Sequence, residues 1–301
     1  MNEKNIPKIS IVTPSFNQAN FLEATIKSVL SQEYPNLEYI IIDGGSTDGS
    51  LEIIKKYEDY LHFWCSEPDR GQYDGINKGF AHSTGEILSW INSDDMYYPW
   101  AFKTVSSIMS SLPEIEWLTT LYPGAWDYCG FCKGFRSIPG YSKEAFLDGA
   151  YLPWGRKAFG WIQQESTFWK RELWEKVDSH IRTEFSLAGD FDLWARFFLY
   201  ADLYGISSPI SGFRRQANSR NTKNYQQYIS EAEKSLITMR NKLNWSPNTF
   251  RKLALQLSIK KIPKLRKWSE SMYSYVGKKV LRKKLDSAQG FWEIEEYKFF
   301  Y

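Results

Sequence analysis

The sequence contains few cysteines, no long apolar run and little net charge. Three cysteines occur in 301 residues, which is typical of a reducing compartment and excludes a disulfide-rich secreted scaffold. Cys129 and Cys132 form a C-x-x-C pair, but a structural zinc site needs four ligands, so we favour an ordinary structural role for both. No segment approaches the ~18 apolar residues of a membrane-spanning helix, and residues 1–8 contain no apolar signal core. These absences predict a cytoplasmic protein.

The net charge of +3 conceals a strongly basic segment near the C-terminus. Residues 251–284 hold twelve Lys or Arg and a single acid, so this segment carries +11 and the remainder −8. Apolar residues interleave with the charges on both sides of Pro263, which predicts amphipathic basic helices. Such helices bind anionic membrane surfaces, although a solvated face packed on the rest of the protein is an equal alternative. No nucleic-acid-binding motif accompanies the charge, so we expect no nucleic-acid partner.

Three short apolar segments are each followed directly by polar residues. Residues 9–12, 39–42 and 87–91 run into TPSFN, DGGSTDG and NSDD respectively. The segments are β-branched and do not alternate with polar residues, which is typical of buried parallel strands. Helical spacing of apolar residues follows the first two, with Asn20 as the expected N-cap of the first helix. An open, mostly parallel sheet flanked by helices is predicted, and its ligand should bind where these strands end.

Four segments together resemble the family-2 glycosyltransferases of the non-processive bacterial type, which have the GT-A fold. They are residues 9–22, the run IDGGSTDGS at 42–50, the run SEPDRGQYDGINKG at 66–79, and WINSDD at 90–95. Each motif is weak, but their order and spacing are specific, and thinner matches extend to residues 213–215. The Q-x-x-R-W signature of processive synthases is absent. We expect residues 1–105 to bind the nucleotide sugar, 106–220 to bind the acceptor and carry catalysis, and 221–301 to form a helical, basic C-terminal region.

Asp94 and Asp95 are the candidate metal-site residues. Hard divalent cations take carboxylate oxygens as ligands, and adjacent strand residues point to opposite faces, so both acids are not expected to hold one ion. The resemblance implies that Asp95 binds Mn²⁺ or Mg²⁺, and that Asp94 contacts the ribose hydroxyls or the metal's water. Ser93 stands in the first acidic place of the family's D-x-D motif. A solvated turn after a strand is the alternative.

The nucleotide pocket is expected between the first two strand ends. Asp43 ends an apolar strand, where a carboxylate needs hydrogen-bond donors; the resemblance implies that it binds the base, and capping of the next helix is the alternative. Arg70 is the candidate for the base or the diphosphate, because a guanidinium suits phosphate. An ion pair of Arg70 with Asp69 or Asp74 is the alternative. The opposite wall of the pocket is expected from Thr13, Pro14 and Asn17.

The acceptor side should supply the catalytic base. Asp190 and Asp192 precede an apolar helical run, and the resemblance implies that one of them removes a proton from the acceptor hydroxyl. Asp190 is preferred, Asp192 is the alternative catalytic residue, and N-capping of a helix is the alternative role for either acid. The remaining acceptor-side candidates are Trp161, Gln164 and Glu165. Core packing is the alternative for Trp161, as for the other aromatic residues.

These observations predict an inverting, metal-dependent glycosyltransferase of the hexosyltransferase type. It would move one sugar from a nucleotide-diphosphate sugar, with UDP favoured, to a saccharide or lipid-linked saccharide during cell-surface polysaccharide synthesis. We expect it in the cytoplasm, in peripheral contact with the inner face of the membrane. The alternatives are an inactive carbohydrate-binding scaffold and a sugar-nucleotide pyrophosphorylase. The pyrophosphorylase is disfavoured because the TPSFN run is not a glycine-rich basic loop.

Overall fold

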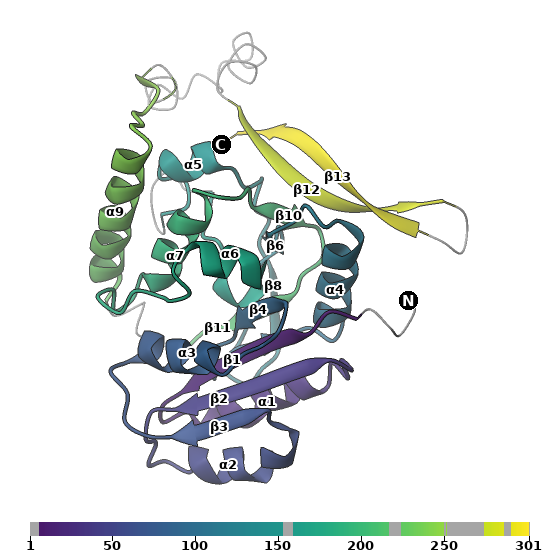
Figure 1. The fold of residues 1–301 in the computed structure, drawn as a ribbon, viewed down its shortest axis with the longest axis vertical. Coiled ribbons are helices and arrows are strands. Elements are labelled where there is room, and N and C mark those ends of the chain that lie inside the picture. Colours follow the sequence, from purple (N-terminus) through teal and green to yellow (C-terminus); the bar gives the residue numbers. More distant parts are fainter. Residues whose placement is uncertain are drawn as a thin grey trace.

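A computed structural model describes residues 6–152, 159–216, 224–249, 251, 274–285 and 290–300. A nine-stranded sheet runs through the molecule in the order β13-β12-β10-β6-β9-β4-β1-β2-β3 (Figure 1). In chain order its strands are β1 (Ile9–Ser15), β2 (Leu37–Asp43), β3 (Phe63–Ser66), β4 (Ile87–Trp90), β6 (Trp117–Thr120), β9 (Phe168–Lys170), β10 (Tyr204–Ile206), β12 (Tyr275–Lys284) and β13 (Gly290–Phe299).

Most neighbouring strands of this sheet are parallel. β1 pairs in parallel with both β2 and β4, and β10 pairs in parallel with β6 and β12. The exceptions are β9, which is antiparallel to β4 and β6, and β13, which is antiparallel to β12. The three strands predicted from the sequence are β1, β2 and β4, and the predicted α/β class with a mostly parallel sheet is confirmed.

Helices cover both faces of the sheet. Alternate strand residues point to opposite sides, so each face presents apolar side chains that pack against helices. Val12 and Ile42 face a core shared with α3 (Gln72–Ala81), α6 (Arg171–Lys176), α7 (Gly189–Phe197) and α9 (Tyr225–Lys242). Ile11 and Ile41 face a second core with α1 (Ala19–Leu30), α2 (Ser50–Lys56) and α4 (Ala101–Ser111). The first core contains the buried rings of Trp90, Trp117, Trp169, Trp174 and Trp194. Core packing therefore accounts for much of the aromatic content.

A smaller four-stranded sheet, in the order β5-β11-β7-β8, lies beside the large one. Its strands are β5 (Met96–Tyr97), β7 (Gly124–Trp126), β8 (Cys132–Phe135) and β11 (Ser211–Arg214). The remaining elements are the short helix α5 (Lys143–Leu147) and the 3-10 turns η2 (Glu58–Tyr60) and η3 (Gln164–Ser166). Because β5 directly follows the NSDD run of the sequence, the small sheet adjoins the carboxyl end of β4.

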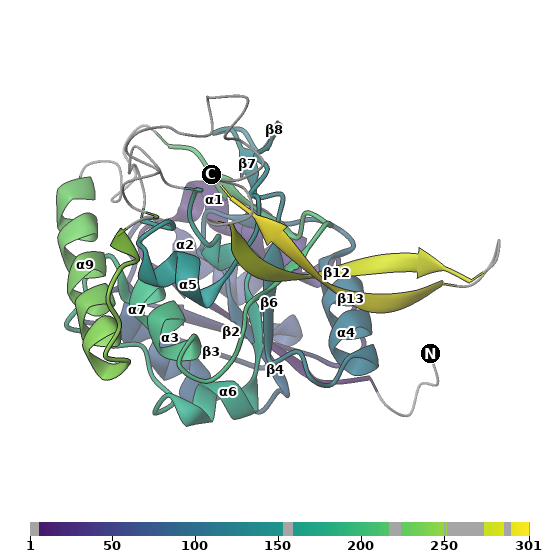
Figure 2. The ribbon, with the colours of Figure 1, turned by 90° about the horizontal axis from the view of Figure 1, so that it is seen from above.

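The structure corrects the expectation of a helix over the end of the basic segment. Residues 275–284 form β12, which pairs with all ten residues of β13 and extends the sheet beyond β10; Figure 2 shows this hairpin projecting past α4. Tyr273, Val276 and Val280 have helical spacing in the sequence, but the free edge of β10 supplies a strand partner. Gly277 permits the close packing of β12 against Phe299, because a Cβ there would lie 2.7 Å from that ring.

The rest of the predicted C-terminal region lies only in part within the described residues. α9 lies within the predicted helical region, whereas residues 252–273 lie outside the described residues. One sheet includes strands from all three predicted segments, so their functional division stays a prediction. Among the described residues, no helix has the length and apolar character that crossing a membrane requires.

The predicted N-cap of α1 is also corrected. Asn20 lies inside the helix, which starts at Ala19 with Gln18 in the cap position. Ser50 Oγ accepts a hydrogen bond from the backbone N–H of Gln18 at 3.0 Å, and Asp48 Oδ2 accepts one from Ala19 at 2.9 Å. A neighbouring loop therefore caps this helix, which short-range sequence patterns do not reveal.

Candidate active site

The loop after β2 is organised by Asp43. This buried carboxylate accepts hydrogen bonds from the backbone N–H groups of Gly45 and Ser46 at 3.1 and 2.8 Å. It also accepts from the hydroxyls of Ser46 and Ser66 at 2.5 and 2.7 Å. Asp43 thus holds the loop in shape with four donors, and its direct contact with a nucleotide base stays a prediction.

Asn17 links the loop after β1 to the loop after β2. It has a left-handed backbone with φ 53°, and its side-chain oxygen accepts a hydrogen bond from Thr47 N at 2.9 Å. Thr13 is buried, with its hydroxyl 3.1 Å from that of Tyr39, and Pro14 lies beside Gly75 at the start of α3. The three residues predicted as one wall of the nucleotide pocket therefore lie at the carboxyl end of β1, next to the Asp43 loop.

Arg70 forms an ion pair with Asp74 at 3.0 Å, and 83% of its side chain is exposed. The ion pair with Asp74, which was the alternative role considered for Arg70, is therefore the arrangement observed. Asp69 occupies the space beside Gly44, since a Cβ on that glycine would lie 2.7 Å from Asp69 Oδ2. Gly71 N donates to Asp69 Oδ1 at 2.8 Å. Sequence reasoning considered Asp69 only as a partner of Arg70 and missed its position against the Asp43 loop.

Asp94 and Asp95 follow β4 and are held by residues at the end of β11. Asp95 is fully buried and accepts hydrogen bonds from Arg214 N at 2.7 Å and from Asn92 Nδ2 at 3.2 Å. Gln216 Nε2 donates to Asp94 Oδ2 at 2.7 Å, and Arg214 Nε donates to the Asp94 carbonyl at 2.6 Å. The end of β11 thus fixes both acids, a tertiary contact that spacing in the sequence does not predict.

The acids near the end of β4 repel one another. Burial, together with the charges of Asp94 and Glu165, holds the pKa of Asp95 well above its usual range. Burial and the nearby Asp94 and Asp190 raise the pKa of Glu165 to about 7, and Glu165 Oε1 is buried without a hydrogen-bond partner among the described residues. Adjacent carboxylates with raised pKa values and an unpartnered oxygen suit a hard divalent cation.

The described residues contain no cluster of three or more His, Cys, Asp or Glu side chains arranged to hold a metal. An ion bound by Asp95, with Asp94 beside it, would have to complete its coordination with water and substrate phosphates, as Mg²⁺ commonly does. The donor set therefore fits a substrate-assisted site rather than a closed protein site.

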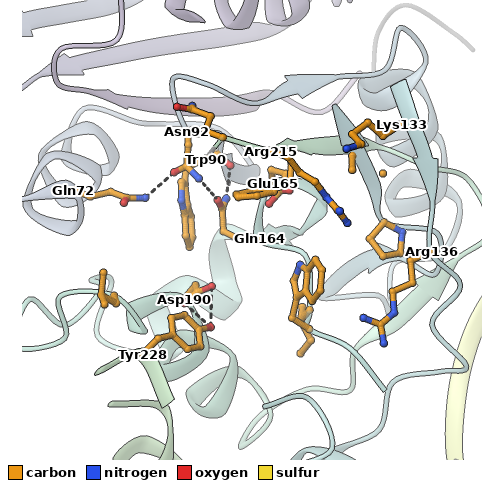
Figure 3. A pocket seen from close by; sticks show the side chains of 18 of the residues that line it. Gln72, Trp90, Asn92, Lys133, Arg136, Gln164, Glu165, Asp190, Arg215 and Tyr228 are labelled. Atoms are coloured by element: carbon orange, nitrogen blue, oxygen red, sulfur yellow. Dashed lines mark hydrogen bonds between the residues drawn. The ribbon is translucent and has the colours of Figure 1, made fainter. Parts of the chain in front are cut away.

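A cavity of about 720 Å³ opens beside this acidic pair and is lined by residues of both the large and the small sheet (Figure 3). Its floor is a hydrogen-bonded chain of amides. Gln72 Nε2 donates to Asn92 Oδ1 at 2.7 Å, and Gln164 Nε2 donates to the Trp90 carbonyl at 2.6 Å. Four of the predicted residues line this cavity: Trp161, Gln164, Glu165 and Asp190. Asn92 and Gln216 also line it and connect it to Asp95 and Asp94.

Asp190 enters the cavity from the first turn of α7, opposite the amide chain (Figure 3). Burial raises the pKa of its carboxyl to about 6, although hydrogen bonds from Phe191 N at 2.8 Å and from the Tyr228 hydroxyl at 3.3 Å favour the charged form. Burial also holds the pKa of Tyr228 well above its usual range, so its hydroxyl stays protonated and donates. Asp190 is thus a carboxylate that gains a proton only slightly below neutral pH.

Asp192 lies in a different environment. It is buried and forms ion pairs with Arg196 at 2.9 Å and Arg182 at 3.3 Å, and it accepts a hydrogen bond from the Ser235 hydroxyl at 2.9 Å. Asp192 therefore ties α7 to α9 inside the protein. Asp190 and not Asp192 is the acid placed in the cavity.

The aromatic candidate Trp161 is 36% exposed in the cavity, beneath the guanidinium of Arg136 at 5.7 Å from the ring centroid. Sequence reasoning missed three basic residues that also line the cavity. They are Lys133, Arg136 and Arg215. They come from or directly follow β8 and β11, so only the pairing of the small sheet brings them together.

Comparison with known proteins matches residues 10–136 to the family model "Glycosyl transferase family 2". An uncharacterised glycosyltransferase of Mycobacterium tuberculosis is 41% identical over 92 residues, which cover 30% of this chain and 35% of that protein. The Bacillus subtilis glycosyltransferase TuaG, named for teichuronic acid biosynthesis, is 35% identical over 94 residues, covering 30% and 37%. The matches to these two relatives span only about a third of their length.

Solved structures extend the similarity of fold beyond this segment. S. aureus TarS 1–349 in complex with UDP-GlcNAc has a TM-score of 0.61 at 16% identity, covering 77% of this chain and 66% of that one. The mannosyltransferase PcManGT from Pyrobaculum calidifontis, in complex with GDP-Man and Mn²⁺, has a TM-score of 0.50 at 17% identity, covering 88% and 84%. These matches confirm the predicted fold class.

Proposed function

We propose that this protein transfers one glycosyl group from a nucleotide-diphosphate sugar to a saccharide or lipid-linked saccharide, with inversion at the anomeric carbon, because residues 10–136 match the family model "Glycosyl transferase family 2". A UDP-sugar is the favoured donor, since TarS has been solved with UDP-GlcNAc and UDP. The similarity to TuaG supports a role in cell-surface polysaccharide synthesis.

The position of Asp190 is the observation that carries this proposal. A general base is most effective when its pKa lies near the working pH, and Asp190 combines a pKa raised to about 6 with a place in the cavity. Asp190 would take the proton of an acceptor hydroxyl as that oxygen attacks the anomeric carbon. The bond from the anomeric carbon to the diphosphate oxygen breaks, and the nucleoside diphosphate leaves with the bonding electrons.

The donor would lie across the carboxyl ends of β1, β2 and β4. Asp95 would hold Mn²⁺ or Mg²⁺, and the ion, when bound, supplies counter-charge to the leaving diphosphate. Asp94 would face the ribose, and the loop ordered by Asp43 would bind the base. Thr13, Pro14 and Asn17 would form the opposite wall. Arg70 would have to leave its ion pair with Asp74 to reach the donor.

Substitution of Asp190 tests the assignment of the base. Asp190→Asn is expected to lower the turnover number by about 10²–10⁴-fold, with the dissociation constant of UDP little changed, because the base acts on the acceptor. In the unmodified protein, kcat/KM should fall about tenfold per pH unit below ~6, where Asp190 becomes protonated. Normal turnover of the Asp190→Asn variant, with Asp192→Asn folded but inactive, would assign the base to Asp192 instead.

Substitution of Asp95 tests the metal site. Asp95→Asn should leave the fold intact, because the amide oxygen can still accept from Arg214 N. Turnover should fall by roughly 10²–10³-fold, the cost of one lost electrostatic stabiliser at the leaving group. Calorimetry with Mn²⁺ and UDP should show weakened metal-dependent binding. Undiminished activity in excess chelator would contradict the metal role.

Titration with UDP, GDP and CDP, each with and without Mn²⁺, distinguishes the transferase from an inactive carbohydrate-binding scaffold. Metal-dependent binding of one nucleotide, followed by hydrolysis or transfer of the matching nucleotide sugar, supports the enzyme. Binding of free sugars without affinity for any nucleotide would support the scaffold.

A further inference from the structure

We propose that the cavity recognises an anionic acceptor through a cationic wall formed by Lys133, Arg136 and Arg215. This proposal rests on the proposed transferase function and names the chemical class of its second substrate: a saccharide that carries a phosphate or carboxylate group. The three side chains lie on one side of the cavity, away from Asp190 and Tyr228 (Figure 3).

A β-bulge sets the position of Lys133. Trp126 of β7 pairs with Cys132 of β8, and Ala125 pairs with Gly134, so Lys133 is the extra, unpaired residue between them. Gly134 has φ +117°, a backbone conformation that side chains disfavour, and a Cβ there would meet no atom within 4 Å. Bulges change the direction of side chains and occur often next to active sites. Both Lys133 and the following Gly134, which has open space around its Cα, line the cavity.

Arg136 and Arg215 are anchored through their backbones and leave charge facing the cavity. Arg136 N donates to the Pro123 carbonyl at 3.0 Å, and Arg215 N donates to the Trp126 carbonyl at 2.9 Å. The Arg136 guanidinium lies over Trp161 and also donates to the Phe159 carbonyl at 3.3 Å. A fork of donors beside an aromatic ring is suited to a sugar that bears an oxyanion.

The wall differs from the other basic clusters because no described acid forms an ion pair with it, although Glu165 and Asp190 line the same cavity. Arg182 and Arg196 pair with Asp192, and in the hairpin Lys279 pairs with Glu295. Lys133, Arg136 and Arg215 form no ion pair with any residue in the described parts of the chain. Unpaired cations that converge on a cavity create a positive potential, which favours an anionic ligand.

The location of Lys133 and Arg136 favours an acceptor anion over the donor diphosphate. Lys133 lies in β8, and Arg136 directly follows that strand. β8 is the edge strand of the small sheet, whereas β5, which directly follows Asp95, lies at the opposite edge, three strands away. The predicted donor residues lie instead at the ends of β1, β2 and β4. A phosphate or carboxylate on the wall would place a neighbouring sugar hydroxyl in the space between the wall and Asp190.

The test uses the full chain and three matched probes: methyl β-glucopyranoside, its 6-phosphate and methyl glucuronide. Ligand-observed NMR titrations with UDP and the diamagnetic Mg²⁺ present should show the two anionic probes binding at least ~10-fold more tightly than the neutral one, because each adds a charge-assisted hydrogen bond. Lys133→Gln and Arg136→Gln should each lower this preference about tenfold, the value of one such bond. Lys103→Gln, an exposed lysine on α4, is the control and should leave the preference unaltered.

Two outcomes would overturn the proposal. Equal binding of neutral and anionic probes to the unmodified protein would remove the need for a cationic wall. A loss of UDP affinity in Lys133→Gln and Arg136→Gln that matches the loss for the anionic probes would assign these cations to the donor's diphosphate. By contrast, selective binding of the anionic probes without any nucleotide affinity would refute the transferase function and leave the anion site supported.

Discussion

At the scale of single residues, the two acids at the start of α7 have opposite electrostatic environments. Burial raises the pKa of Asp190 to about 6 without a cationic partner among the described residues, whereas Asp192 has two arginine partners. A residue that costs stability at neutral pH and faces a cavity is typical of a functional site.

Asp190→Asn is therefore expected to stabilise the protein at neutral pH. The folded pKa of Asp190 lies above the ~3.9 of an unfolded aspartate, so the unfolded state ionises first and stability falls as pH rises from about 4 to 6. Removal of the charge should raise the free energy of unfolding by on the order of 2 kcal/mol at pH 7, measured by denaturant titration. Near pH ~3.5 the difference should disappear, because both states are then largely protonated. A variant that is less stable at pH 7 would contradict a half-buried charge without a cationic partner.

Asp192→Asn should have the opposite effect on stability. The amide leaves the buried guanidinium of Arg196 without its ion partner, and breaking one side of a buried ion pair costs roughly 3–5 kcal/mol. Thermal unfolding should occur at a clearly lower temperature than in the unmodified protein or in Asp190→Asn. An unchanged melting temperature would show that Asp192 does not hold α7 against α9.

At the scale of elements, α9 positions the start of α7. Glu231 Oε2 accepts hydrogen bonds from Leu187 N at 2.9 Å and Ala188 N at 3.0 Å, just before α7. Tyr228, one turn earlier on α9, contacts Asp190 itself. Asp190 is thus oriented by a helix that follows it in the chain by more than thirty residues.

Glu231→Ala should uncouple the two helices. Two buried N–H groups lose their acceptor, which costs about 2–3 kcal/mol of stability, and turnover should fall while the UDP dissociation constant changes little. Glu233→Ala, an exposed acid on the same helix, is the matched control for helix propensity and charge. Equal effects of the two substitutions on turnover would exclude a positioning role for Glu231.

At the scale of the whole molecule, the C-terminal hairpin is part of the core and of the sheet. Tyr275, Val280 and Phe299 are buried, so removal of everything after residue 248 would destabilise the protein rather than only remove charge. Lys278 pairs with Asp202 at 2.7 Å and Lys279 pairs with Glu295 at 2.8 Å, which neutralises part of the basic segment. Membrane attraction is therefore expected from the basic residues of 252–273, outside the described residues.

A charge substitution tests this membrane prediction more cleanly than a truncation. The full chain should bind vesicles containing anionic lipid, more strongly as lipid charge rises and less strongly as salt rises. Replacing Lys260, Lys261 and Lys264 with Gln should weaken binding by ~1 kcal/mol for each charge. The control replaces three exposed lysines elsewhere: Lys55, Lys103 and Lys242. Sedimentation with vesicles gives the bound fraction of each protein. Equal binding of the two triple variants would show that the attraction depends on net charge alone and not on the segment 252–273.

The sequence by itself determined three strands of the large sheet, the fold class and the polar residues that follow those strands. Apolar β-branched runs and the turn residues after them act locally, so β1, β2, β4 and the Asp43 and Asp95 loops were predictable from short segments. Motif order also placed Asp190, Gln164 and Glu165 on the acceptor side, and the cavity contains all three.

Only the tertiary structure decided which acid faces the cavity, because the raised pKa of Asp190 and the ion pairs of Asp192 depend on neighbours from distant segments. It also decided that residues 275–284 form a strand, since an amphipathic pattern with short apolar spacing fits a helix or a strand until a free sheet edge is available. The cationic wall arises in the same way. Its three residues are brought together by strand pairing and a bulge, and both depend on contacts between segments that no local pattern encodes.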